Sequence, residues 1–186
     1  MSVFLYFCTM NKGVSVDFRF LTLADLDCLV DLERVVLESI PDATLLRSNT
    51  ISMWKICLSG PHKTLAAFSD GNLVAISVLY FPERGEDDDL SQYLISLPFH
   101  DCGNLRLSSA NHKICLVHPG YRGFGLQVSM ARALEQYAKE IGVRLLCATI
   151  SPKNVYSRSN ALSMGMVYDS TIIKYGSERD LFYKFI

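Results

Sequence analysis

The sequence lacks the features that mark several classes of protein. Its 18 Lys and Arg nearly balance its 19 Asp and Glu, for a net charge of −1, whereas a nucleic-acid-binding chain normally carries a basic surface. No apolar stretch approaches the length of a membrane-spanning helix. The six cysteines form no C-x-x-C pair, and no Cys/His group has zinc spacing. We therefore expect no nucleic acid, no membrane and no metal, in a reduced, cytoplasmic setting.

Repeats, low-complexity tracts and domain linkers are also missing. The 186 residues are 49% hydrophobic and 20% charged, which suits one domain with a packed core. The first residues, MSVFLYFCTM, are apolar but have no basic leader and no cleavage site of small residues. We interpret residues 1–13 as an N-terminal extension that lies against the body or a partner subunit, and residues 14–186 as a single domain. A homodimer through this extension or the closing strands is compatible with the sequence.

Apolar periodicity and turn residues divide the chain into alternating strands and helices. In chain order, we predict a strand at residues 14–21, a helix between the capping sequence at 22–25 and Pro41, a helix at about 48–58, a hairpin of strands 64–68 and 73–81 around Asp70-Gly71, a strand at 113–117, a helix from 126 to Gly142, a strand at 143–150, a short helix at about 155–164, and two closing strands at 166–175 and 181–186. The unit spanning residues 113–150 is predicted to be a right-handed parallel crossover.

Residues 82–110 read mostly as a loop, and a loop of this length in a compact domain is usually functional. The loop carries an acidic run at residues 86–89, Glu-Asp-Asp-Asp. Two interpretations are open: the run attracts a cationic substrate, or it is an ordinary solvated segment.

The stretch VHPGYRGFGLQ at residues 117–127 has the composition of an anion-binding loop. Gly123 and Gly125 allow a sharp turn and close approach of the backbone to a ligand. The helix that follows exposes unpaired N–H groups at its first turn, where its dipole is positive. Arg122 adds a permanent cation. A phosphate-bearing ligand is therefore expected here, although a simple strand-to-helix turn would use the same glycines.

Two common phosphate loops do not fit these residues. A nucleoside-triphosphate loop needs Lys-Ser or Lys-Thr after its glycines, and none follows here. A dinucleotide loop needs a third glycine, where this chain has Val128. A dinucleotide-dependent enzyme is therefore disfavoured.

At these residues the sequence resembles the GNAT superfamily of N-acetyltransferases. Their pyrophosphate loop reads [Q/R]-x-x-G-x-[G/A] after V-x-P-x-[Y/F], and all but the final small residue agree, because Gln127 stands there. A second landmark is Asn154, followed by Gly165-Met166 at the family's spacing, with Ser157 between them. The order of elements matches the family from about Val14 onward.

The resemblance implies a three-layer α+β fold of the GNAT-like acyl-CoA N-acyltransferase type. Its sheet would be mixed and mostly antiparallel, with the fourth and fifth strands, 113–117 and 143–150, parallel and splayed around CoA. It also implies a set of residues that bind acetyl-CoA, as co-substrate: Leu116, Val117, Arg122, Gly123, Phe124, Gly125, Leu126, Gln127, Asn154 and Ser157.

The implied function is an acyltransferase that moves an acetyl group from acetyl-CoA to a primary amine of a small molecule or peptide by direct attack. One departure concerns the acid: the family's tyrosine seven residues after the Asn is Ala161 here. Tyr156 is a substitute candidate, and Glu83 or His112 is a candidate base. The alternative is a catalytically weak acyl-CoA-binding or sensor protein of the same fold. The acceptor amine is not identified by these motifs.

Overall fold

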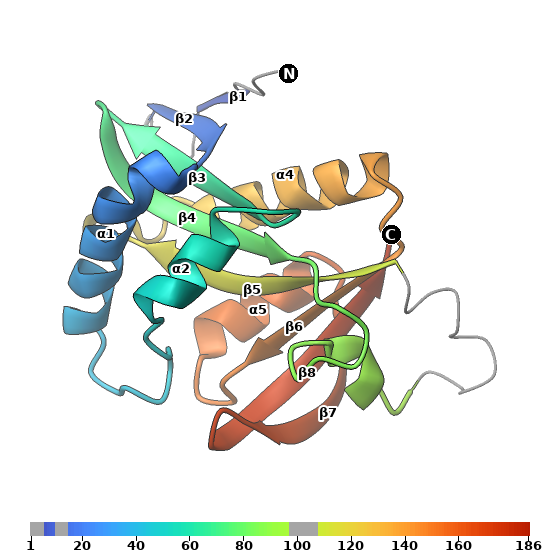
Figure 1. Ribbon diagram of the computed structural model, residues 1–186. Coiled ribbons are helices and arrows are strands. Elements are labelled where there is room, and N and C mark those ends of the chain that lie inside the picture. The colour runs from blue at the N-terminus through green and yellow to red at the C-terminus, as the bar shows by residue number, and fades with distance from the viewer. Residues whose placement is uncertain (1–5, 10–14, 97–107) are drawn as a thin grey trace.

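A computed structural model describes residues 6–9, 15–96 and 108–186. These residues form one sheet of eight strands in the order β1-β2-β3-β4-β5-β6-β8-β7 (Figure 1). The strands are β1 Tyr6–Thr9, β2 Ser15–Phe20, β3 Lys63–Ser69, β4 Asn72–Tyr80, β5 Ser109–Val117, β6 Leu145–Ile150, β7 Val167–Lys174 and β8 Ser177–Phe185. The helices are α1 Leu26–Glu38, α2 Ile51–Cys57, α4 Leu126–Glu140 and α5 Val155–Ser163, with short 3-10 turns η1 Leu23–Asp25, η2 Leu90–Tyr93 and η3 Pro119–Tyr121.

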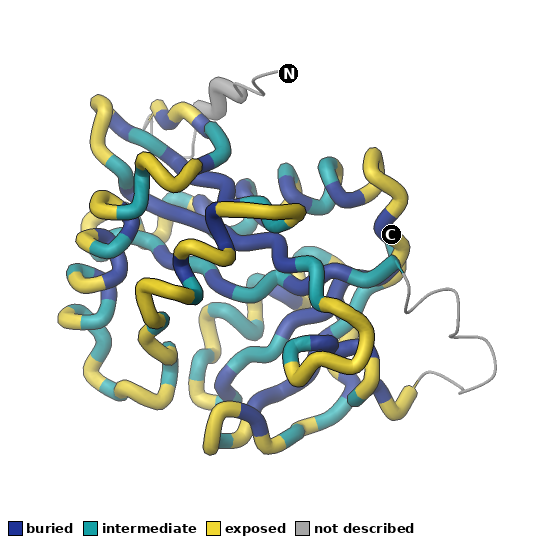
Figure 2. Tube along the Cα trace, in the orientation of Figure 1, coloured by how far each residue is buried: buried dark blue, intermediate teal, exposed yellow. Residues whose placement is uncertain are grey.

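The predicted three-layer α+β architecture is confirmed. Helices α1 and α2 cover one face of the sheet and α4 and α5 the other (Figure 1). One core cluster joins α1 and α2 to the sheet through Leu29, Trp54 and Ile76, and a second joins α4 through Met130 and Leu134. The buried residues follow the strands and the inward faces of the helices (Figure 2). No helix among the described residues is long and apolar enough to cross a membrane.

Helix α1 carries one buried residue that periodicity alone does not explain. Glu33 is 5% exposed on the same face as Leu29 and Val36. One carboxylate oxygen accepts the Trp54 indole N–H at 2.7 Å, and the other accepts the backbone and side-chain N–H groups of Asn49 at 2.9 and 2.8 Å. These bonds tie the segment before α2 to α1, which matters because this segment borders the pocket described below.

The parallel pair was predicted correctly, but β5 begins four residues earlier than expected. Parallel pairing with β6 is confined to Ser109, Ala110 and Asn111, all of which precede the predicted start of the strand. Beyond Asn111, β5 continues along β4 while β6 continues along β8. The two strands therefore separate in the middle of the sheet, as the predicted splay requires.

A β-bulge lies where β5 and β6 separate. The β4–β5 register passes from Val78↔Ile114 to Leu79↔His112, so Lys113 is the extra residue. Before the bulge, Ala110 packs on the α4 side, whereas after it Ile114 and Leu116 pack on the α1 side. The bulge therefore exchanges the two faces of β5.

The predicted N-terminal extension contains β1, which pairs antiparallel with β2 through residues 6–9 and 15–18. This segment therefore lies against the body of its own chain, at the edge of the sheet (Figure 1). The domain boundary at residue 14 stays a prediction.

Candidate functional site

The glycine-containing loop runs from the end of β5 to the start of α4. His118 is held by its N–H, which donates to the Val74 carbonyl at 2.8 Å, and its Nδ1 accepts the Gly120 N–H at 3.2 Å. Gly123 and Gly125 have φ of +81° and +82°, a region that residues with a Cβ rarely adopt. No atom lies within 4 Å of a Cβ built on either glycine, so the loop faces open space. The first turn of α4 then presents N–H groups that have no intrahelical acceptor.

Arg122 does not point freely into solvent. Its Nη2 donates to the Ser39 hydroxyl at 2.7 Å, and Ser39 is the C-terminal cap of α1. The hydrogen bond fixes the guanidinium beside the glycine loop. The predicted role of Arg122 beside a pyrophosphate stays a prediction, as does that of Phe124.

Gln127, the residue that departs from the family motif, is directed towards α5. Its Oε1 accepts the Asn160 amide at 2.7 Å and its Nε2 donates to the Ser157 hydroxyl at 3.4 Å. The side chain therefore joins α4 to α5 and leaves the start of α4 uncovered. This geometry keeps the longer side chain of Gln127 from crowding an anion at the loop.

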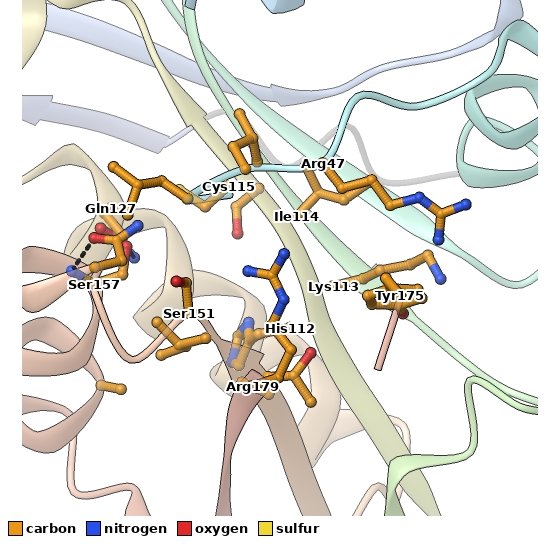
Figure 3. Close-up of a pocket in the computed structure, with 18 of the residues that line it drawn as sticks. Arg47, His112, Lys113, Ile114, Cys115, Gln127, Ser151, Ser157, Tyr175 and Arg179 are labelled. Atoms are coloured by element: carbon orange, nitrogen blue, oxygen red, sulfur yellow. Dashed lines mark hydrogen bonds between the residues drawn. The ribbon is translucent and has the colours of Figure 1, made fainter. Parts of the chain in front are cut away.

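A pocket of about 240 Å³ occupies the gap between β5 and β6 (Figure 3). Gln127, Asn154 and Ser157 line one end. The Asn154 side chain caps α5 by accepting the Ser157 N–H at 3.0 Å. Leu126 is buried in the core, and neither Leu116 nor Val117 contributes its side chain to the pocket, so their predicted contacts with CoA would be made by the backbone.

The other end of the pocket is formed by residues from distant parts of the chain. Arg47 precedes α2, Lys113 lies at the bulge of β5, and Tyr175 lies at the turn between β7 and β8 (Figure 3). The Arg47 guanidinium lies 4.8 Å from the centre of the Tyr175 ring. His112 and Arg179 lie between the two ends.

The acidic run is built into this end rather than free. Asp88 pairs with Lys113 and accepts the Tyr175 hydroxyl at 2.6 Å. Asp87 pairs with Lys174 at 3.0 Å. Burial opposes ionisation of Asp88, but Lys113 and Tyr175 outweigh it and hold the pKa of its carboxyl below the usual value. The interpretation as a solvated segment is wrong for Asp88, whose side chain is largely buried, but it fits Asp87, whose side chain is exposed. Lys174 and Lys113 neutralise the two charges, which leaves neither carboxylate free to attract a cationic substrate.

The candidate catalytic residues occupy very different positions. Tyr156 is 82% exposed and Glu83 is also exposed, and neither lines the pocket. Their roles stay predictions. His112 does line the pocket, and within the described part of the chain its buried Nδ1 has no hydrogen-bond partner. Burial lowers the pKa of His112 to about 4, so the imidazole is neutral at physiological pH. Ala161 is buried against the pocket, so that position offers no proton donor.

The sequence motifs did not identify several residues that line this pocket. Arg179 has one signal in the sequence: it alternates with Leu181 and Tyr183 along β8, which places a cation on a buried face. Arg47, Lys113 and Tyr175 have no such signal, because their proximity depends on how loops from distant segments fold together.

No family model and no curated protein matches this sequence. Solved structures do match the fold. The GNAT domain of S. lividans PAT is 14% identical, with a TM-score of 0.72 over 98% of this chain and 97% of that chain. An acetyltransferase of the GNAT family from Streptococcus pneumoniae is 18% identical, with a TM-score of 0.68 over 92% and 99%. The PaiA N-acetyltransferase of Thermoplasma acidophilum, solved in complex with coenzyme A, is 14% identical, with a TM-score of 0.64 over 92% and 99%.

These similarities extend over nearly the whole of each chain. The chain has the fold of the GNAT acetyltransferases.

Proposed function

We propose that this protein is an N-acetyltransferase that uses acetyl-CoA as donor and a primary amine of a small molecule or peptide as acceptor. The observation that carries the proposal is the separation of β5 from β6 at Asn111, with the glycine loop and the start of α4 at the end of the same gap. Beyond Asn111, no described strand pairs with the edge of β5 that faces the gap. An amide-bearing pantetheine arm can pair with such an edge as an added strand does.

The residues of the loop suit a pyrophosphate. Positive φ at Gly123 and Gly125 turns the backbone so that N–H groups at the start of α4 face open space. Backbone N–H groups at a helix N-terminus bind phosphate without a charged side chain. Asn154 and Ser157 line the opposite side of the gap. We therefore assign the CoA-binding set as expected from the sequence, with the backbone of Gln127 rather than its side chain in contact.

The proposed reaction forms a bond between the amine nitrogen and the acetyl carbon and breaks the bond from that carbon to sulfur, releasing CoA after the thiolate takes a proton. The His118 N–H donates to β4, and successive N–H groups of a strand alternate in direction, so the Val117 N–H faces the gap. It would stabilise negative charge on the carbonyl oxygen. His112 is the candidate base that lines the gap, and its ring is neutral at physiological pH. A pKa of about 4 makes it a weak base.

Two measurements test the function. Calorimetry should detect CoA binding, and CoA at 100 times its Kd should stabilise the fold by about 2.7 kcal/mol. Thiol release from acetyl-CoA should then appear with at least one class in a panel of small amines and peptides. Absence of CoA-dependent stabilisation at millimolar CoA would contradict the whole proposal. Tight CoA binding without turnover on any amine would contradict the acetyl-transfer step alone.

The three candidates for proton transfer can be ranked by variants. We expect His112→Gln to lower kcat by about 100-fold, the usual contribution of one acid–base group. Glu83→Gln and Tyr156→Phe test the sequence-based alternatives in the same assay, with CoA Kd measured in parallel. If Glu83→Gln or Tyr156→Phe lowers kcat while His112→Gln does not, the assignment of His112 is wrong.

A further inference from the structure

Arg179 is a buried cation that projects into the pocket. It lies on β8 and is 7% exposed. Figure 3 shows its guanidinium in the middle of the gap, between Ser151 on one side and Lys113 and Tyr175 on the other. The side chain comes from the strand beyond β6, so it reaches the gap from the side opposite β5.

Within the described residues, the Arg179 side chain makes no ion pair or hydrogen bond, and its buried Nε has no partner. The other buried cations nearby differ. Lys113 pairs with Asp88, and Lys174 pairs with Asp87. The next residue on β8, Asp180, pairs with Arg158 at 2.9 Å. The local carboxylates are thus committed to other cations, and among the buried cations that line the described pocket only Arg179 keeps its charge unbalanced. Arg47 also has no carboxylate partner, but it is exposed and contacts the Tyr175 ring.

Burying an unpaired guanidinium is unfavourable, because the charge loses water and gains no counter-ion. Burial accordingly lowers the pKa of Arg179. Such a residue destabilises the free protein unless a ligand supplies the missing charge. The position of the guanidinium in the pocket, rather than at the surface, identifies the ligand as one that enters the gap.

Arg179 lies on the face of β8 that is turned away from α5. Leu181, on the same face, packs with Leu90 and Leu94 around η2, whereas Phe182 packs with Ala161 of α5. Arg179 therefore projects into the middle of the pocket from the face of β8 opposite α5, the helix that carries Ser157 (Figure 3). In the proposed function, Asn154 and Ser157 belong to the CoA end of the pocket, so the Arg179 guanidinium lies beyond them, where the reacting groups would meet.

We propose that Arg179 binds a carboxylate of the reacting pair, and that the acceptor is an amine that carries this carboxylate, such as an amino acid. The inference rests on the proposed function and names its substrate class. A planar guanidinium matches a carboxylate through two parallel hydrogen bonds. One unbalanced cation neutralises one carboxylate, whereas a phosphate would bring nearly two charges. A carboxylate on the acyl group of the donor has the same chemistry and is tested separately.

The first experiment compares the twenty amino acids with their amides as acceptors of acetyl from acetyl-CoA. We expect the preferred amino acid to exceed its own amide in kcat/KM. In Arg179→Met, that preference should fall by about 10- to 100-fold, the value of a charge-assisted hydrogen-bonded pair, mainly through KM for the acid. Because the same two acceptors are used with both proteins, differences in amine basicity cancel. Arg132→Met removes an equal charge from the exposed face of α4 and should leave the preference unchanged.

Stability separates binding from a structural role. Because the guanidinium is unpaired, Arg179→Met is expected to leave Tm unchanged or to raise it. A fall in Tm with an unchanged preference for the acid would assign Arg179 to the fold and overturn the proposal. If Arg179→Met does not fold, Arg179→Lys keeps the charge without the planar fork and should lose part of the preference.

Two further experiments complete the test. One asks whether the carboxylate belongs to the donor or to the acceptor, and the other tests the carboxylate site if the protein acetylates no amine. If succinyl-CoA is used with amino acid amides, and Arg179→Met abolishes that reaction but not acetyl transfer to amino acids, the carboxylate belongs to the donor and the acceptor assignment is wrong. If no amine is acetylated, N-acetyl amino acids and their amides are titrated calorimetrically onto the protein with CoA. Arg179-dependent binding of the acids alone supports the carboxylate site, and equal or absent binding overturns it.

Discussion

At the scale of single residues, His112 lies where β5 and β6 separate, and the Nδ1 of its imidazole is buried. Its pKa is about 4 in the folded chain, against about 6.5 for an unperturbed histidine. Between these values the unfolded chain binds a proton that the folded chain does not. The stability conferred by a neutral His112 is therefore complete above about pH 6.5 and is lost progressively as the pH falls towards 4.

We predict that the free energy of unfolding falls less between pH 7.5 and pH 5.5 in His112→Gln than in the wild type. From the two pKa values, the wild type should lose about 1.4 kcal/mol between pH 7.5 and 5.5 through this residue. Burial also lowers the pKa of His62, which acts in the same direction in both proteins. Urea unfolding at the two pH values measures the difference. Equal losses in wild type and variant would mean that His112 is not held neutral.

At the scale of elements, the contact between α4 and α5 depends on Gln127. Replacement by alanine removes the bonds to Asn160 and Ser157 but leaves the backbone N–H at the start of α4. We predict that Gln127→Ala preserves CoA Kd or improves it, while unfolding free energy falls by about 1 kcal/mol. Asn160→Ala breaks one of these bonds from the other helix, so it should preserve CoA Kd and lose no more unfolding free energy than Gln127→Ala. A large loss of CoA affinity in Gln127→Ala alone would show that the amide side chain binds the ligand.

The two ends of α4 offer a matched pair of glycines. Gly125 at its start and Gly142 after its end have φ of +82° and +84°, and nothing lies within 4 Å of a Cβ on either. Alanine at each position should therefore impose the same backbone strain, about 1–2 kcal/mol. We predict that both variants lose similar stability but that only Gly125→Ala weakens CoA binding, by more than about 10-fold, because it disturbs the amides of the loop. Equal CoA Kd in the two variants would contradict the assignment of the loop.

At the scale of the whole molecule, β1 completes one edge of the sheet. It covers the β2 backbone at residues 15–18, far from the gap between β5 and β6 (Figure 1). We predict that removal of residues 1–13 leaves CoA Kd within about two-fold but makes the protein self-associate, since an uncovered strand edge pairs with other chains. Calorimetry and light scattering after size exclusion measure the two effects. A truncated chain that remains monodisperse, or one that loses CoA binding, would contradict this.

The order of elements could be predicted from the sequence because each depends on local patterns. The Asp70-Gly71 turn and the apolar stripe of α4 are examples. The start of β5 was missed because residues 109–112, Ser-Ala-Asn-His, have no apolar alternation and are placed in the sheet by their neighbours. Of the proposed site, the end assigned to CoA carries a contiguous motif, so the sequence could indicate it. At the end assigned to the acceptor, Asp88 and Tyr175 are 87 positions apart, and no local pattern encodes their contact.

The bulge at Lys113 makes the effect of a deletion in β5 depend on its position. Because His112 lies opposite Leu79 and Ile114 lies opposite Val78, the two halves of the strand would alternate regularly if Lys113 were absent. Deleting the Lys113 codon should therefore leave Ile114 and Leu116 facing α1, and remove only the bulge and the ion pair with Asp88. Deleting the Cys115 codon would instead turn Leu116 and Val117 towards the wrong layers. The protein should therefore tolerate a change in the number of residues at the bulge but not two residues further along the strand.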